Sequence, residues 1–151
     1  MIVLASTKSF QISLASVREH HDGLNQHRSE LFNRLPKVGD WGKFPVDSIT
    51  MKDLAYLTAY TGHEFALLRG KREDILFHGE RTRCRFDDIL VDMLMSGKLL
   101  LVGHSHPGEE MPVPSPDDRE TLRKIGQKKS KLISGYSGIE VEFTGDVFEI
   151  I

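Results

Sequence analysis

Two histidines, His104 and His106, stand two positions apart at the end of an apolar run that covers residues 98–103. If this run is a β-strand, its period of two places both imidazole rings on the same face of the sheet. Imidazole nitrogens are ligands that zinc prefers, and two of them with one carboxylate leave a fourth position for water. The alternative is that two polar side chains simply end a strand. A third ligand at a suitable place in the chain would favour the metal site.

The segment Ser115-Pro116-Asp117-Asp118 offers that ligand. Serine is a common helix N-cap, proline is common at the first helical position, and the helix dipole favours carboxylates in the first turn. Taken alone, the pattern predicts an ordinary helix start. Because Ser115 and a carboxylate three residues later share one helix end, we expect both side chains to lie beside the histidine pair.

Together, His104-Ser105-His106-Pro107, a short loop and the S-x-x-D pattern at 115–118 resemble the zinc motif of the JAB/MPN metalloproteases, also called JAMM proteases. The resemblance covers roughly residues 62–143. It implies that the two histidines and the aspartate hold Zn2+, that Ser115 helps to stabilise the oxyanion, and that an upstream glutamate acts on the water. It also implies an MPN/JAB-like (cytidine-deaminase-like) architecture with one mixed β-sheet flanked by helices.

The spacing of the ligands departs from the family pattern by one residue. The family usually has seven residues between the second histidine and the serine, whereas this chain has residues 107–114 there. Counted from His106, the aspartate is Asp117; counted from Ser115, it is Asp118. We predict Asp118, because a helical turn fixes the serine-to-aspartate geometry while a loop rich in proline and glycine can absorb one residue.

The predicted general base is Glu64, which begins the apolar stretch 64–68. A carboxylate within hydrogen-bond reach of the water can take its proton and later give it to the leaving amine. The family often has a glycine soon after this glutamate, where the chain has Ala66. The competing candidate is Glu80, which follows Gly79 in a polar turn and is expected to be solvated.

The rest of the pattern predicts the elements that position these residues. We expect a mixed α/β (α+β) fold in a single domain, 1–151, in which residues 1–45 form an N-terminal strand and helix extension packed on the core. Predicted strands cover residues 2–5, 10–14, 64–68, 74–78, 83–86, 98–103, 132–135, 139–143 and 147–151. Predicted helices cover 17–35, 48 or 50 to 62, and 87–97, with Ile89, Leu90, Met93 and Leu94 facing inward, and a last helix begins at Ser115; residues 37–45 are expected to be a loop.

Composition narrows the possible partners. The 151 residues include 20 basic and 22 acidic side chains, a formal charge of −2, which argues against a dedicated nucleic-acid binder. The single cysteine, Cys84, cannot form an internal disulfide. No apolar run approaches the ~20 residues that a membrane helix needs, and the first residues do not resemble a signal peptide. We therefore expect a cytoplasmic protein without a membrane partner.

The function that the JAB/MPN resemblance implies is zinc-dependent hydrolysis of peptide or isopeptide bonds in a polypeptide substrate, such as a ubiquitin-like protein. Only residues 65–103 separate Glu64 from His104, which leaves little room for an insertion that recognises ubiquitin and favours a compact prokaryotic-type enzyme. One alternative is a non-catalytic MPN scaffold that binds proteins. Another is a RadC-like domain linked to DNA metabolism, which the acidic residues around the motif disfavour (Glu109, Glu110, Asp117 and Asp118).

Overall fold

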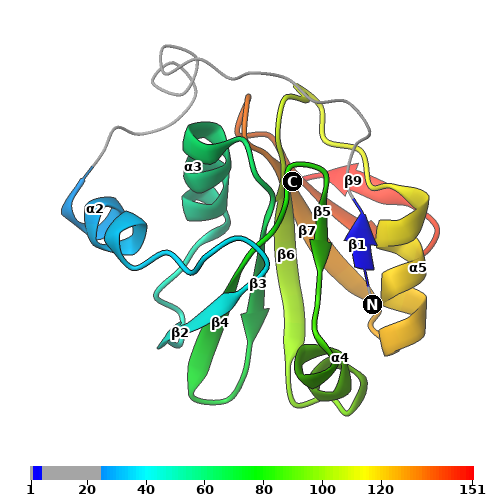
Figure 1. Ribbon diagram of the computed structural model, residues 1–151. Helices are drawn as coiled ribbons and strands as arrows, with labels where there is room; N and C mark the ends of the chain where they lie inside the picture. Colours follow the sequence, from blue (N-terminus) through cyan, green and yellow to red (C-terminus); the bar gives the residue numbers. More distant parts are fainter. Residues whose placement is uncertain (1, 5–24) are drawn as a thin grey trace.

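The computed structural model describes residues 2–4 and 25–151, and in them one mixed sheet of seven strands is flanked by four helices (Figure 1). The predicted α+β class with a single mixed sheet is confirmed. In spatial order the strands are β2 (Trp41–Pro45), β4 (Glu73–His78), β3 (Phe65–Arg69), β6 (Leu100–His106), β7 (Lys129–Ser134), β8 (Glu140–Thr144) and β9 (Phe148–Ile150). Neighbours are antiparallel except β6 and β7, which run parallel. A separate two-stranded ladder joins β1 (Ile2–Leu4) to β5 (Arg83–Arg85).

The helices begin where capping residues predict. Thr50, Asp87 and Ser115 are the N-caps of α3 (Met51–Thr61), α4 (Asp88–Met95) and α5 (Pro116–Ile125), and each accepts a hydrogen bond from a backbone N–H of the first turn. The fourth helix, α2 (Gln26–Asn33), is capped by Asn25. The single helix expected at 17–35 does not run through Asn25, which is extended, so α2 covers only the later part of that range. Residues 17–24, like the strand expected at 10–14, lie outside the described residues.

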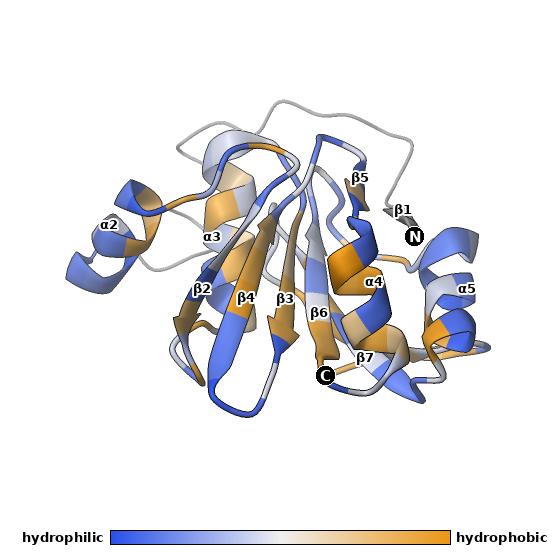
Figure 2. Ribbon diagram, turned by 60° about the horizontal axis from the view of Figure 1, so that its bottom comes forward, coloured by the Kyte–Doolittle hydropathy of each residue, from blue (hydrophilic) through white to orange (hydrophobic). Residues whose placement is uncertain are grey.

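The alternation of side chains along the strands divides the core into two layers. On β3, Phe65 and Leu67 pack with the apolar residues of α3, whereas Ala66 and Leu68 pack with those of α4 and α5. Figure 2 shows α3 on one side of the sheet and α4 and α5 on the other, with much of β3 coloured as hydrophobic. The sheet is therefore a middle layer between α3 on one face and α4 with α5 on the other.

Helix α3 packs closely on the sheet because two residues that face it, Gly103 and Gly135, have no side chain. A Cβ atom on Gly103 would come within 2.6 Å of the Met51 side chain, and one on Gly135 within 2.4 Å of Thr58. These glycines let the helix contact β6 and the end of β7 directly, which fixes the end of β6 that carries the two histidines.

Three further expectations about local structure are wrong. Residues 41–45, expected in a loop, form β2. Among the described strands it is an edge strand that pairs with β4, and edge strands tolerate glycine and proline. Ile89, expected to face inward, is 60% exposed, because the buried stripe of α4 consists of Leu90 and Leu94. The strand predicted at 98–103 begins two residues later and continues to His106, and its first residue, Leu100, is exposed rather than buried on both faces.

Candidate metal centre

The last three residues of β6 alternate across the sheet as the period of a strand requires. Ser105 points toward α3, where its hydroxyl lies 2.5 Å from the Thr58 hydroxyl and accepts a hydrogen bond from the Phe65 N–H at 3.0 Å. His104 and His106 point to the opposite face, and both are fully buried. The predicted placement of the two imidazole rings on one face is therefore confirmed.

The start of α5 brings the third group to the same place. Ser115 and Asp118 form a reciprocal capping box: the Asp118 N–H donates to the Ser115 hydroxyl at 3.0 Å, and the Ser115 N–H donates to the Asp118 carboxylate at 2.9 Å. These two bonds turn the Asp118 side chain inward, where it is 1% exposed. Asp117 is exposed to solvent. Of the two aspartates left open by the spacing, Asp118 is the one that lies with the histidines.

Three ligand atoms converge on one point from these two elements. His104 Nε2 lies 3.1 Å from His106 Nε2, 3.2 Å separates His104 Nε2 from Asp118 Oδ1, and 3.3 Å separates His106 Nε2 from Asp118 Oδ2. Bonds of ~2.0–2.2 Å to a tetrahedral zinc ion hold neighbouring ligand atoms about 3.3–3.5 Å apart. The separations in the protein are close to that spacing, so this buried group could hold a metal ion.

The electrostatics of the cluster favour a positive charge at its centre. Burial opposes protonation of His106, but the carboxylates of Asp118 and Glu109 outweigh it and raise the pKa of that imidazole to about 10. Burial likewise favours a neutral Asp118, yet His104 and His106 hold the pKa of its carboxyl well below its usual range. A metal ion that binds there would have to displace any proton on the coordinating nitrogen of His106, because a histidine ligand must be neutral.

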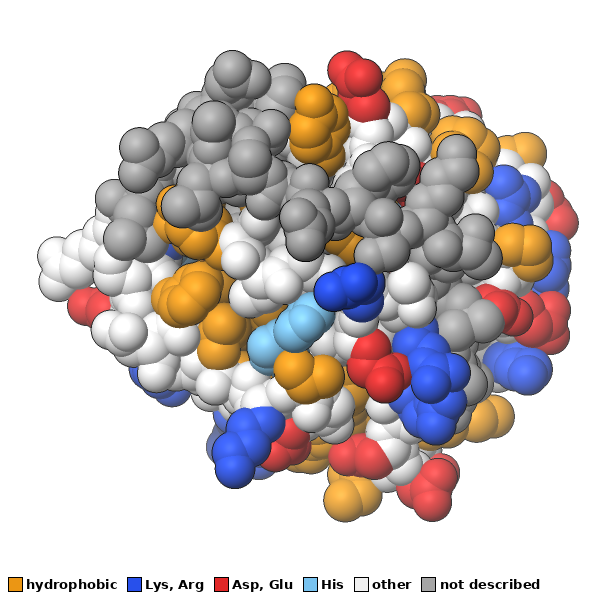
Figure 3. Space-filling model, turned by 45° about the horizontal axis from the view of Figure 1, so that its top comes forward, with side chains coloured by type: hydrophobic (Ala, Val, Ile, Leu, Met, Phe, Trp, Pro, Cys, Tyr) orange, Lys and Arg blue, Asp and Glu red, His pale blue; other side chains and the backbone are white. Residues whose placement is uncertain are grey.

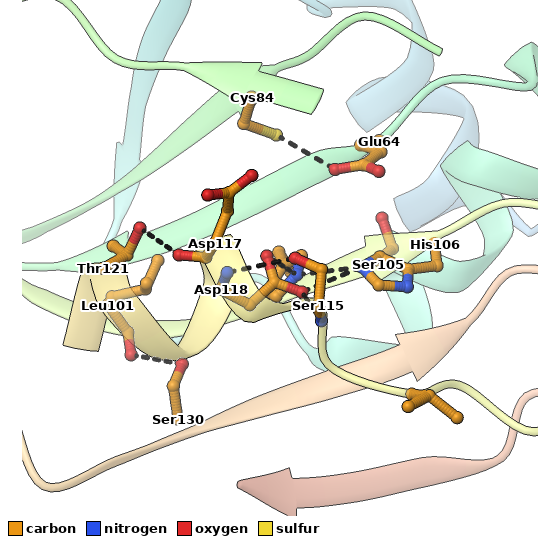
Figure 4. A network of polar contacts seen from close by, with 12 residues as sticks. Glu64, Cys84, Leu101, Ser105, His106, Ser115, Asp117, Asp118, Thr121 and Ser130 are labelled. Atoms are coloured by element: carbon orange, nitrogen blue, oxygen red, sulfur yellow. Dashed lines mark hydrogen bonds and ion pairs between the residues drawn. The ribbon is translucent and has the colours of Figure 1, made fainter. Parts of the chain in front are cut away.

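Glu64 lies beside this cluster, immediately before β3. Its side chain is fully buried, and its backbone is fixed at both ends, since its N–H donates to the Glu80 carbonyl and its carbonyl accepts from the Gly79 N–H. Burial raises the pKa of the Glu64 carboxyl well above its ordinary value; His106 opposes this, and Asp118 and Glu109 add to it. The antiparallel pairing of Ala66 with His104 brings Glu64 to the same end of the sheet as His106, and Figure 4 shows Glu64, His106 and Asp118 in one view.

The Glu64 carboxyl group also lies near the thiol of Cys84, a contact that the sequence does not predict. Cys84 of β5 is fully buried, and its Sγ lies 4.0 Å from Glu64 Oε1 (Figure 4). The other oxygen, Oε2, has no hydrogen-bond partner within residues 2–4 and 25–151. A carboxylate in this state has an accepting atom available for water or substrate.

Glu80, the alternative base, lies at the surface. Its carboxylate is half exposed and binds the Arg83 guanidinium at 2.7 Å, as expected for a solvated turn. Only its backbone carbonyl touches the Glu64 segment. The structure thus places Glu64, and not Glu80, next to the histidines.

One nearby residue was not singled out from the sequence as part of the site. Glu109 Oε1 lies 3.7 Å from His106 Nδ1, on the side of the ring that faces away from the cluster. The available signal was a carboxylate three residues after a candidate histidine ligand.

On the molecular surface outside the cluster, histidine side chains lie among hydrophobic, basic and acidic ones (Figure 3).

The chain matches no protein-family model, no curated protein and no solved structure. The JAB/MPN resemblance therefore stays a prediction from the motif residues, while the buried His-His-Asp group stands on the positions of its own atoms. Among the described helices, none is both long enough and apolar enough to cross a membrane.

Proposed function

We propose that this protein is a zinc-dependent peptidase or isopeptidase of the JAB/MPN (JAMM) type. The observation that carries the proposal is the convergence of His104, His106 and Asp118 on one buried point, with the buried carboxyl group of Glu64 beside it. Two imidazole nitrogens and one carboxylate oxygen are the donor set of many catalytic zinc sites, in which a fourth position stays open for water.

The residues present fit a zinc ion in chemistry as well as in spacing. No cysteine sulfur belongs to the group of three, so the donors are nitrogen and oxygen, which suit zinc in a catalytic role. When bound, zinc supplies Lewis acidity that lowers the pKa of a coordinated water toward ~7 and polarises a carbonyl group. The remaining steps fall to side chains of this chain.

Glu64 is assigned the role of general base and general acid. Its buried position raises its pKa, and a carboxyl group with a raised pKa can both accept a proton from water and return it to a leaving amine near neutral pH. The unpartnered Oε2 is the atom that would hold this proton.

Ser115 is assigned the stabilisation of the oxyanion. The hydroxyl oxygen accepts a hydrogen bond from the Asp118 N–H, which fixes its position at the start of α5. A hydroxyl group carries one O–H donor besides its acceptor lone pairs, and a donor held at the edge of the metal cluster is suited to a developing oxyanion.

The substrate is proposed to be a polypeptide, with ubiquitin-like proteins as one class. Residues 65–103, between the base and the first ligand, are used up by β3, β4, β5, α4 and the first part of β6. This segment therefore contains no separate insertion to recognise a large folded partner. Such a compact core favours the prokaryotic-type enzyme over a subunit of a large complex.

The test compares Glu64→Gln with Glu80→Gln, since both remove one carboxylate near the same turn. Glu64→Gln should bind zinc normally and lose about 10²–10⁴-fold in turnover, because a neutral amide cannot accept the proton of water. Glu80→Gln should keep the turnover of the parent. Cleavage would be followed on ubiquitin-like fusions and unstructured peptides.

Two results would contradict the proposal. If Glu80→Gln abolishes cleavage and Glu64→Gln does not, the base is misassigned. If zinc-loaded parent protein cleaves none of these substrates and both variants behave like it, the non-catalytic scaffold becomes the better description.

A further inference from the structure

The imidazole of His106 has a carboxylate on each side. Its Nε2 faces Asp118 and His104, while its Nδ1 lies 3.7 Å from Oε1 of Glu109. The Nδ1 atoms of both histidines are buried and, within the described part of the chain, neither makes a hydrogen bond; of the two, the Nδ1 of His106 is the one with a carboxylate oxygen within 4 Å. The two candidate ligands therefore differ in whether a carboxylate lies near the Nδ1 side of the imidazole ring.

Glu109 is held in place from both its side chain and its backbone. Its Oε2 accepts a hydrogen bond from the Val113 N–H at 3.2 Å, across the loop that joins His106 to Ser115. Its carbonyl oxygen accepts from the hydroxyl of Ser134, at the end of β7. The Glu109 side chain is only 16% exposed. Since both attachments are made away from His106, the position of Oε1 is set independently of the ring.

We propose that Glu109 is a positioning residue for His106, an inference that rests on the metal site of the proposed function. A histidine that coordinates through Nε2 must carry its ring proton on Nδ1, and an acceptor behind the ring fixes that tautomer and the ring orientation. Oε1 of Glu109, which lies 3.7 Å from Nδ1 with no metal bound, is the acceptor that the Nδ1–H would take when zinc holds the ring through Nε2. The loop of residues 107–114 thus connects two metal ligands and also supplies the group that orients one of them.

A glutamine at position 109 would not be able to replace both functions of the Glu109 carboxylate. The Val113 N–H donates to one carboxylate oxygen of Glu109, and the other oxygen lies 3.7 Å from His106 Nδ1, which carries a proton when the ring coordinates through Nε2. Glutamine has one carbonyl oxygen and one NH₂ group, so that it can accept only one of these two bonds, and its NH₂ group then opposes the other donor. Either the ring loses its acceptor or the loop loses its internal bond.

The test measures zinc affinity by competition with a chromophoric chelator for the parent, Glu109→Gln and Glu110→Gln. Glu110 is the matched control, because it is the next residue of the same loop, carries the same charge and is exposed. Glu109→Gln should bind zinc about 10–100-fold more weakly than the parent. Glu110→Gln should match the parent. Thermal midpoints of the metal-free forms would show whether the loop is equally stable in both variants.

A second measurement observes the His106 ring proton directly. In the zinc-loaded parent, NMR should show the His106 ring protonated at Nδ1, with a slowly exchanging proton at low field. That signal should persist in Glu110→Gln and be lost or move upfield in Glu109→Gln. A role limited to loop stability would not move it.

The possible failures are distinguishable. A parent that binds no zinc overturns the proposed function itself. A parent that binds zinc, with equal affinities in both variants or with His106 protonated at Nε2, overturns only the role of Glu109. Loss of zinc as complete as in His104→Ala also overturns it, because Glu109 would then be a ligand rather than a positioning residue.

Discussion

Replacing Asp118 by asparagine tests the metal site with the helix start preserved. The Asp118 carboxylate accepts from the Ser115 N–H and also faces both histidines. Asparagine keeps an oxygen that can accept the capping bond, but it lacks the negative charge that a cation requires. Asp117→Asn is the control, because Asp117 occupies the same helical turn and is exposed.

The expected magnitude follows from linkage between binding and folding. Zinc at about 100 times its Kd stabilises the parent by about 2.7 kcal/mol. For a chain of this length that corresponds to a rise in the thermal midpoint of roughly 5–11 °C. If Asp118→Asn weakens binding about a hundredfold, the same zinc concentration contributes only about 0.4 kcal/mol, or roughly 1 °C.

The assay is thermal unfolding of each protein with and without zinc, with each variant compared with its own metal-free form. Asp117→Asn should show the full shift of the parent, since any loss of helix-dipole stabilisation, about 0.3–1 kcal/mol, affects both of its forms equally. Asp118→Asn should show almost no shift. A full shift in Asp118→Asn together with a lost shift in Asp117→Asn would refute the assignment of Asp118.

Further outcomes are expected at the same site and at the contact of α2 with α3. Elemental analysis should find one zinc per chain in the parent and none in the double variant His104→Ala/His106→Ala; stoichiometric zinc in the variant would contradict the ligand set. Ser115→Ala should lower the free energy of unfolding of the metal-free protein by about 0.5–2 kcal/mol as a lost cap, and should lower turnover by up to ~10²–10³-fold. Burial opposes ionisation of Asp53, but the Thr50 N–H, His27 and Arg28 lower the pKa of its carboxyl below the ordinary 3.8. Its stabilisation is thus present above pH 3.8 and lost as the pH falls toward the lowered value, so urea titrations should show Asp53→Asn less stable by about 1–3 kcal/mol at pH 7 and this difference shrinking in acid.

Local sequence patterns were sufficient to predict the strand end and the helix start that carry the candidate ligands. The alternation of β6 places His104 and His106 on one face, and the capping pattern begins α5 at Ser115 with Asp118 three residues later. Both follow from interactions between residues close in the chain, namely the pleat of a strand and the hydrogen bonds of a helix N-terminus. Local interactions of this kind can be predicted from the sequence without knowledge of the tertiary structure.

Long-range contacts decided the rest. Residues 41–45 form a strand because β4 offers them an open edge, and Ile89 is exposed because the sheet meets α4 along Leu90 and Leu94. A carboxylate three residues after His106 does not by itself tell that Glu109 reaches the back of the ring, and no spacing tells that Cys84 lies against Glu64.

The sequence by itself therefore determined which residues could be ligands and which elements carry them. The helix start already favoured Asp118 over Asp117, and the tertiary structure placed the Asp118 carboxylate against the two histidines while Asp117 stays exposed. It also placed a buried Glu64 beside the cluster, where burial raises the pKa of its carboxyl. Distance, burial and charge around a site depend on segments that meet only when the chain folds, and a one-dimensional pattern does not contain them.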